Sequence, residues 1–431
     1  MERILVVGVE LLKHQKTSAP GISNTGDTRS SIEELQSLCI TAGGIPVECV
    51  IQKRKTIDPA YFIGYGKVEE IKRIVEEKRI DTVVFNDELT PVQQRNLENA
   101  INRKIVDRTR LILDIFAQRA RTREGELQVE LAQLLYLLPR LTKKGISLSQ
   151  QVGGIGTRGP GETKLEVDRW RIRNRIALLR KNIEKIKQYR EIQRMQRKEI
   201  PLPVVAIVGY TNAGKSTLLN RLTEKNDIYA DDKLFATLDP TTRQVKLKDG
   251  RIVLFTDTVG FIQNLPTQLV AAFRATLEEI TFADLILKVI DVSTPYWKQQ
   301  ASVVDNILNE MKIPRNKIIC VFNKIDLLTA KHVEQITKYN CGIPISATKG
   351  YGIERLLSEV EKFFSENLIE KEYILPYNMS NILPHLKNTS IIVEKNFLPE
   401  GVKIKIKALP KITSQIEKLL DDNNSKYVNH T

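Results

Sequence analysis

The sequence VVAIVGYTNAGKST at residues 204–217 decides the fold of the centre of the chain. Its first five residues predict a buried strand, and residues 209–216 match GxxxxGK[ST] ahead of a helix-like segment. In such a loop the backbone N–H groups curl around phosphate oxygens, and the helix N-terminus favours negative charge. Lys215 would reach the β- and γ-phosphates as a catalytic cation, and Ser216 would ligate Mg²⁺. The residues expected to line this phosphate site are Gly209, Tyr210, Thr211, Asn212, Ala213, Gly214, Lys215 and Ser216.

Three later loops, each after a predicted strand, point to guanine as the base. They are Asp257-Thr258-Val259-Gly260, Asn323-Lys324-Ile325-Asp326 and Ser346-Ala347-Thr348. Asp257 would hold Mg²⁺ through water, and the Gly260 N–H would contact the γ-phosphate as a catalytic group. Asp326 can accept from N1–H and N2–H₂ of guanine, whereas adenine offers no such donor pair. Four loops in this order, at the carboxyl ends of strands, predict a GTP/GDP site.

A switch segment is expected between the phosphate loop and Asp257. Such a segment needs a threonine that binds Mg²⁺ only while the γ-phosphate is present. Thr237 is the first choice, as both metal ligand and catalytic residue, and Thr241 and Thr242 remain alternatives. Phe261 follows Gly260, and its apolar side chain cannot orient a nucleophilic water, so we expect slow intrinsic hydrolysis that a partner accelerates. The segment expected to contact nucleotide comprises Phe235, Ala236, Thr237, Leu238 and Asp239.

The rest of the chain predicts an α/β multidomain protein. Residues 1–118 alternate strand-like and helix-like segments, which is typical of a small parallel α/β domain. Residues 119–200 carry two apolar seams at helical spacing, which predict a long antiparallel helical hairpin. Residues 201–369 would form the P-loop GTPase domain, a mostly parallel sheet with helices on both faces, and residues 370–431 a small C-terminal α+β unit.

The hairpin region is strongly basic. The chain has a net charge of +14, and residues 140–200 alone contain 17 Lys or Arg and six Asp or Glu. Five glycines and a proline at residues 153–161 exclude a helix in the connection, so we expect a glycine-rich basic tip. A solvated helix face would also explain the charge, but a polyanion such as RNA fits it as well. The residues expected to contact RNA are Lys143, Lys144, Gly153, Gly154, Gly156, Arg158, Gly159, Gly161, Lys164 and Arg169.

Other functional classes find little support in the sequence. No apolar stretch approaches the roughly 20 residues of a membrane span, and the N-terminus reads as a first strand instead of a signal peptide. The four cysteines and four histidines are scattered, which argues against a zinc site or a disulfide. We therefore expect a cytoplasmic monomer with reduced thiols, and leave attachment to ribosomes or to a membrane surface open.

With these residues located, the chain resembles the HflX-type GTPases of the TRAFAC class, within the Obg–HflX-like superfamily. Residues 153–169, GGIGTRGPGETKLEVDR, are similar to the family hallmark, with Lys164 for the usual Gln and Trp170 for the usual Arg just after it. Residues 64–67, 85–89 and the stretch from 107–109 through 128–131 also resemble family segments, while the last 60 or so residues resemble the family only loosely. The resemblance implies a GTPase that binds the large ribosomal subunit and splits or rescues stalled ribosomes under stress, with the glycine-rich tip near the rRNA.

Two other hypotheses remain. The same domains could serve an assembly factor that acts on immature large subunits. Alternatively, GTP could control a protein partner of the hairpin, in which case RNA is incidental. The sequence does not decide whether ATP is a second substrate.

Overall fold

The computed structural model describes residues 1–12, 28–141, 160–196, 202–223, 235, 240–263, 279–329, 332–334 and 342–428. The chain forms two compact units. Unit 1 comprises Met1–Lys187, Asp231–Asp239 and Phe261–Ala275, and unit 2 comprises Gln188–Ala230, Pro240–Gly260 and Thr276–Thr431. Each unit is described by itself below.

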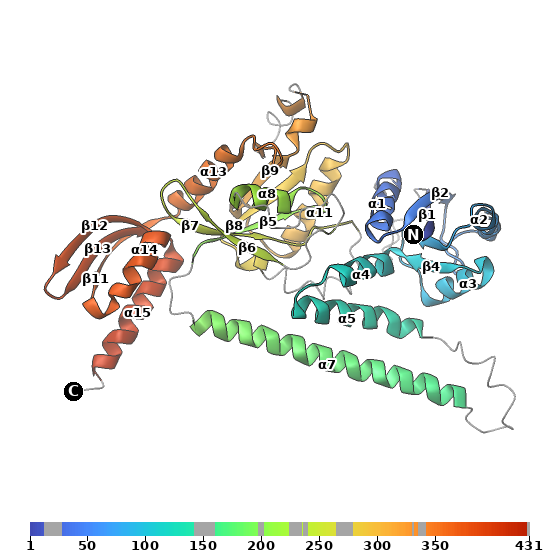
Figure 1. The fold of residues 1–431 in the computed structure, drawn as a ribbon, viewed down its shortest axis with the longest axis horizontal. Helices are drawn as coiled ribbons and strands as arrows, with labels where there is room; N and C mark the ends of the chain where they lie inside the picture. Colours follow the sequence, from blue (N-terminus) through green and yellow to red (C-terminus); the bar gives the residue numbers. More distant parts are fainter. Residues whose placement is uncertain are drawn as a thin grey trace. The chain divides into compact units, whose positions relative to one another are not determined.

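Unit 1 begins with a four-stranded parallel sheet in the order β2-β1-β3-β4 (Figure 1). The strands are β1 (Arg3–Leu11), β2 (Ile45–Arg54), β3 (Thr82–Phe85) and β4 (Lys104–Asp107), and the helices are α1 (Thr28–Thr41), α2 (Tyr65–Glu77), α3 (Pro91–Ile101) and α4 (Arg108–Arg119). The residues of β3 are all buried, as suits a parallel sheet with both faces covered. Thr90 and Gln93 form a capping box ahead of α3, with Pro91 in its first turn.

The helical hairpin follows as α5 (Arg123–Leu137), the short helix η1 (Leu138–Arg140) and α7 (Pro160–Gln196). Figure 1 shows α5 and α7 running side by side. Arg175 on α7 donates from its Nε and Nη2 to the two carboxylate oxygens of Glu130 on α5, at 2.7 and 2.8 Å. The Arg169 guanidinium donates to the carbonyl of Leu141 at 3.0 Å, so the two arms are antiparallel.

The expectation of a non-helical connection was wrong at its end, because α7 begins at Pro160 and includes Gly161. Proline is well tolerated in the first turn of a helix, where its missing N–H has no partner to lose. The side chain of Lys164 is not described, and Lys143, Lys144 and residues 153–159 lie entirely outside the described residues.

A buried polar cluster fixes the base of the hairpin to the first sheet. Asp107, at the end of β4, is only 1 % exposed and accepts from the Tyr136 hydroxyl at 2.9 Å. Arg140 donates to the same carboxylate at 3.3 Å and to the Leu89 carbonyl at 2.7 Å, and its guanidinium stacks 3.5 Å above the Tyr136 ring. Burial raises the pKa of Asp107, against the opposing pull of the Arg110 N–H and of Arg140.

Unit 2 contains a six-stranded sheet in the order β10-β9-β8-β5-β7-β6, in which only β6 runs antiparallel. The strands are β5 (Val204–Gly209), β6 (Thr241–Lys246), β7 (Ile252–Asp257), β8 (Leu285–Asp291), β9 (Ile318–Asn323) and β10 (Gly342–Pro344). The described helices are α8 (Lys215–Thr223), η2 (Arg315–Lys317), η3 (Ile325–Leu327), α11 (Trp297–Glu310) and α13 (Ile353–Glu366). The parallel strands place their carboxyl ends at one edge, where ligands bind in such sheets.

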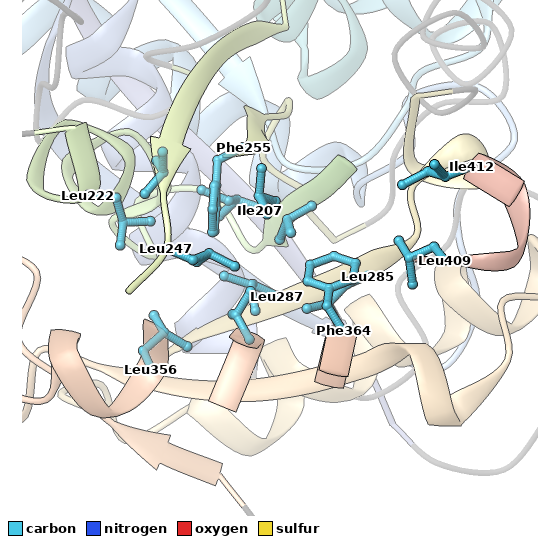
Figure 2. Packing of buried hydrophobic residues seen from close by; sticks show 14 of the residues in the cluster. Ile207, Leu222, Leu247, Phe255, Leu285, Leu287, Leu356, Phe364, Leu409 and Ile412 are labelled. Carbon is cyan, nitrogen blue, oxygen red and sulfur yellow. The ribbon is translucent and has the colours of Figure 1, made fainter. Parts of the chain in front are cut away.

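The chain ends in a three-stranded antiparallel sheet, β11-β13-β12, with α14, η4 and α15. The bounds are β11 (Ile369–Leu375), η4 (Tyr377–Ile382), α14 (Leu383–Thr389), β12 (Ile391–Leu398), β13 (Gly401–Ala408) and α15 (Pro410–Val428). One apolar core runs from Leu287 in β8 through Phe364 in α13 to Ile412 in α15 (Figure 2). The predicted fold class is confirmed: a parallel α/β domain, a helical hairpin, a P-loop GTPase fold and a C-terminal α+β unit.

Candidate nucleotide site

The phosphate loop lies between β5 and α8 in a strained conformation. Asn212 and Gly214 have φ values of 59° and 87°, which are left-handed, and the Ala213 N–H donates to the Tyr210 carbonyl at 3.2 Å. Gly214 permits this path because a Cβ there would lie 2.3 Å from the Asn323 Nδ2. Asn212 tolerates the left-handed region better than most residues, and such strain is typical of functional loops.

Lys215 is folded into this loop. Its ammonium donates to the Tyr210 carbonyl at 2.9 Å and is 3.4 Å from the Gly209 carbonyl. The residue is 7 % exposed, and burial lowers the pKa of Lys215 to about 8, against the opposing charge of Asp257. In the described contacts the ammonium has only carbonyl oxygens as hydrogen-bond partners. The phosphates of a nucleotide would favour its charged form, so Lys215 is well suited to bind them.

The expected magnesium ligands lie next to one another. The Ser216 hydroxyl donates to Oδ2 of Asp257 at 2.6 Å, and Asp257 is fully buried at the end of β7. A hydroxyl and a carboxylate at the phosphate end of the loop fit Mg²⁺, which prefers oxygen ligands and keeps several waters. The hydroxyl of Thr258, by contrast, donates to the Ile207 carbonyl at 2.8 Å, so its side chain braces β5.

Asn323 joins the phosphate loop to the third loop of the site. Its Nδ2 donates to the Ala213 carbonyl at 2.8 Å, and its Oδ1 accepts from the Ala347 N–H at 3.0 Å. Asn323 is 2 % exposed, so both hydrogen bonds are shielded from water. The side chain of Asn323 therefore holds the loops together, while Asp326 on η3 is exposed and open to a base.

Two residues that the sequence reading missed complete this edge. Asp291, 6 % exposed at the end of β8, pairs with the Lys324 ammonium at 2.7 Å. Arg221 on α8 donates to the Ala347 carbonyl at 3.1 Å and to the Thr348 carbonyl. Asp291 fixes the direction of the Lys324 side chain, and Arg221 fixes the backbone at Ala347. Neither belongs to a short motif, although an Asp at the end of a buried strand was a usable signal.

The expected switch segment is described only at Phe235, since Ala236, Thr237, Leu238 and Asp239 lie outside the described residues. Within unit 1, the Phe235 ring packs edge-on against Phe116 at 4.6 Å. The alternative threonines lie on β6, where the Thr242 hydroxyl is 2.9 Å from that of Thr256, and Thr241 pairs in register with Asp257.

Three family models match consecutive parts of the chain. Models described as GTP-binding GTPase N-terminal, GTP-binding GTPase Middle Region and 50S ribosome-binding GTPase match residues 29–117, 119–197 and 204–324. A GTPase HflX from Caldanaerobacter subterraneus subsp. tengcongensis is 47% identical over 93% of this chain and 92% of its own length. The chain belongs to the HflX family of GTPases.

A second HflX relative agrees with this assignment, and one solved structure is similar to the chain. GTPase HflX from Escherichia coli (strain K12) is 43% identical over 80% of this chain and 82% of its own. A GTP-binding protein from Sulfolobus solfataricus, solved with GDP, is 25% identical, covers 84% of this chain and 98% of its own, and aligns with a TM-score of 0.44. As an HflX-family member the chain binds guanine nucleotide and hydrolyses GTP.

Two other features are absent from the residues that the structure describes. There, no helix is long and apolar enough to cross a membrane. Among the same residues, no three His, Cys, Asp or Glu side chains group as metal ligands. Cys39, Cys49 and Cys320 are free thiols, and burial raises the pKa of Cys39 to about 12, so it is unreactive.

Proposed function

We propose that this GTPase is a cytoplasmic, monomeric switch that binds the large ribosomal subunit through its helical hairpin and splits or rescues stalled ribosomes under stress. The observation that carries the proposal is the helical hairpin, whose described part exposes basic side chains and which shares one chain with the loops of a guanine-nucleotide site. A model described as 50S ribosome-binding GTPase matches the nucleotide-binding region, which supports the same partner.

In the nucleotide site each loop has a distinct role. Residues 209–216 would wrap the phosphates, with Lys215 neutralising charge that develops at the γ-phosphate. Ser216, Asp257 through water and Thr237 would hold Mg²⁺, which would supply positive charge to the phosphates. Asp326 would recognise guanine, with Lys324 along the base and residues 346–348 capping O6. Gly260 would donate its N–H to the γ-phosphate and so report its presence.

The hairpin is suited to RNA because its exposed side is cationic. On α7, Arg171, Arg173, Arg180, Lys181 and Lys185 are exposed, while Ile176 and Leu179 are buried. The Glu130–Arg175 pair joins α5 to α7, and Arg140 ties the end of the first arm to the Leu89 carbonyl. Contacts to phosphate and shape, instead of base reading, would then dominate binding. The glycine-rich tip would approach the rRNA most closely.

The test is steady-state GTP hydrolysis by the full chain with and without mature large ribosomal subunits. We expect a slow basal rate that subunits raise many-fold, because Phe261 cannot orient water and a partner must complete the site. A rate that subunits leave unchanged contradicts the ribosome proposal while leaving the GTPase assignment intact. Stimulation by precursor particles alone would favour an assembly role.

A charge reversal separates RNA from a protein partner. Arg173→Glu combined with Lys181→Glu changes exposed residues of α7, and Arg73→Glu combined with Arg95→Glu on α2 and α3 is the matched control. We expect the α7 variant to lose subunit binding and to flatten its salt dependence by about one unit of slope per lost phosphate contact. Equal subunit binding by both variants contradicts an RNA contact on the hairpin and favours the scaffold hypothesis.

A further inference from the structure

The site has no glutamine after Gly260, yet one hydroxyl in the phosphate loop is left without a partner. Thr211, the third residue of the loop, is 5 % exposed, and its Oγ1 is buried with no hydrogen bond from any described residue. Nearby hydroxyls are satisfied: Ser216 bonds to Asp257, and Thr258 bonds to Ile207. An unmade hydrogen bond at a buried hydroxyl costs about 1–3 kcal/mol, so this group needs an explanation.

The position of Thr211 supplies one. A Cβ built on Gly260 would lie 2.8 Å from the Thr211 Cα and 2.9 Å from its Cγ2. The same point is 2.9 Å from the Lys215 ammonium. Thr211, Lys215 and Gly260 therefore meet at one place, and the last two are the groups expected to contact the γ-phosphate.

We propose that Thr211 is a catalytic residue, whose hydroxyl accepts a hydrogen bond from the attacking water and donates one to a γ-phosphate oxygen. It takes the place of the glutamine that Phe261 replaces. The proposal rests on GTP hydrolysis at this site and does not depend on the ribosome.

The reaction balances without any change in Thr211. A bond forms between the water oxygen and the γ-phosphorus, and the bond from that phosphorus to the β–γ bridging oxygen breaks. The electron pair of the broken bond leaves with GDP, and the proton of the water ends on inorganic phosphate. Thr211 keeps its own proton and only orients the reactants, which is the main task of a protein in phosphoryl transfer.

A simple packing role is the competing explanation. The Thr211 methyl group lies against Gly260, and valine would fill that space equally well. The two explanations differ in which part of the side chain matters: the hydroxyl for catalysis, the methyl group for packing. Valine and serine substitutions separate these parts.

The experiment is single-turnover GTP hydrolysis by the full chain without ribosomes, together with GTP and GDP affinities. We expect Thr211→Val to slow hydrolysis about 10- to 100-fold, with affinities within about threefold, because the hydroxyl acts in the transition state. Thr211→Ser should restore most of the rate. Thr389→Val is the control, since Thr389 is also buried and bonds only to the His385 carbonyl in the described contacts.

Three results would overturn the proposal. One is a Thr211→Val rate within threefold of the unchanged protein. Another is an equal loss of GTP and GDP affinity with no loss of rate, which marks a binding role shared by both nucleotides. The third is a Thr211→Ser variant that hydrolyses GTP as slowly as a Thr211→Ala variant, which has lost both the hydroxyl and the methyl group. That result assigns the effect to the methyl group. Thermal unfolding of each variant shows whether it is folded, and the serine–alanine comparison decides if valine does not fold.

Discussion

Asn323→Ala tests whether the nucleotide site is held together by one side chain. The substitution leaves the Ala213 carbonyl and the Ala347 N–H without their partners, at a position 2 % exposed to water. Each buried group left unpaired costs about 1–3 kcal/mol. Allowing for partial relaxation of the loops, we expect the free energy of nucleotide binding to weaken by about 2–4 kcal/mol. This corresponds to a factor of about 30 to 1000 in nucleotide affinity. Because neither hydrogen bond touches the γ-phosphate position, GTP and GDP should lose affinity alike.

The assay is fluorescent-nucleotide binding by the full chain, alongside thermal unfolding. Asn86→Ala is the control, since Asn86 is 3 % exposed, follows β3 and bonds to Ser31 on α1 and Arg108 on α4. It should lower the unfolding temperature without weakening nucleotide binding. If Asn323→Ala folds and binds both nucleotides within threefold of normal, the loops are held by other contacts. A loss confined to GTP would likewise refute the reasoning.

Three further predictions concern buried charges. Burial lowers the pKa of Lys215 to about 8, and bound phosphates should raise that pKa. Nucleotide binding should therefore take up a proton, and nucleotide affinity should fall as the pH rises above about 8. Calorimetry at about pH 8.5 in buffers of different ionisation enthalpy measures the proton uptake. Arg140→Met should raise the pKa of Asp107 further, because it removes a positive charge beside that carboxylate. It should also loosen the base of the hairpin, which is measured as faster amide exchange in residues 123–140. Arg251, 2 % exposed, pairs with Asp249 and donates to the Ser365 hydroxyl at 2.8 Å, so Arg251→Met should cost about 2–4 kcal/mol in denaturant unfolding.

The strands that precede the expected nucleotide loops could be predicted from the sequence because each is a run of apolar residues that ends at a short motif. The strands expected before Gly209, Asp257 and Asn323 are β5, β7 and β9. What the sequence could not supply were the contacts between loops. Asp291 meets Lys324 across 33 positions, and Arg221 meets Ala347 across 126, so no local pattern announces either pair.

Elements were missed where periodicity is weak. The four residues of β4, Lys104–Asp107, are too few to show an alternation. In β11 the stretch Glu370–Glu372 is exposed and charged, which does not look like a strand. The sheet tolerates these charges because lysines on β13 neutralise them: Glu372 pairs with Lys403 at 2.6 Å and Glu370 with Lys405 at 2.7 Å. Cross-strand ion pairs of this kind are visible only once the register is known.

The division into units bears on how GTP could act as a switch. GTP and GDP share the contacts expected from residues 209–216, 323–326 and 346–348, so a difference must arise next to the γ-phosphate. The chain changes from one compact unit to the other at Asp239–Pro240 and again at Gly260–Phe261. Both junctions border the segments expected to sense that phosphate. We therefore expect the γ-phosphate to act on Gly260, the last residue of its segment of unit 2, through a contact that GDP cannot make. Hydrolysis would remove that contact next to Thr211, whose Cα and Cγ2 lie 2.8 and 2.9 Å from a Cβ built on Gly260.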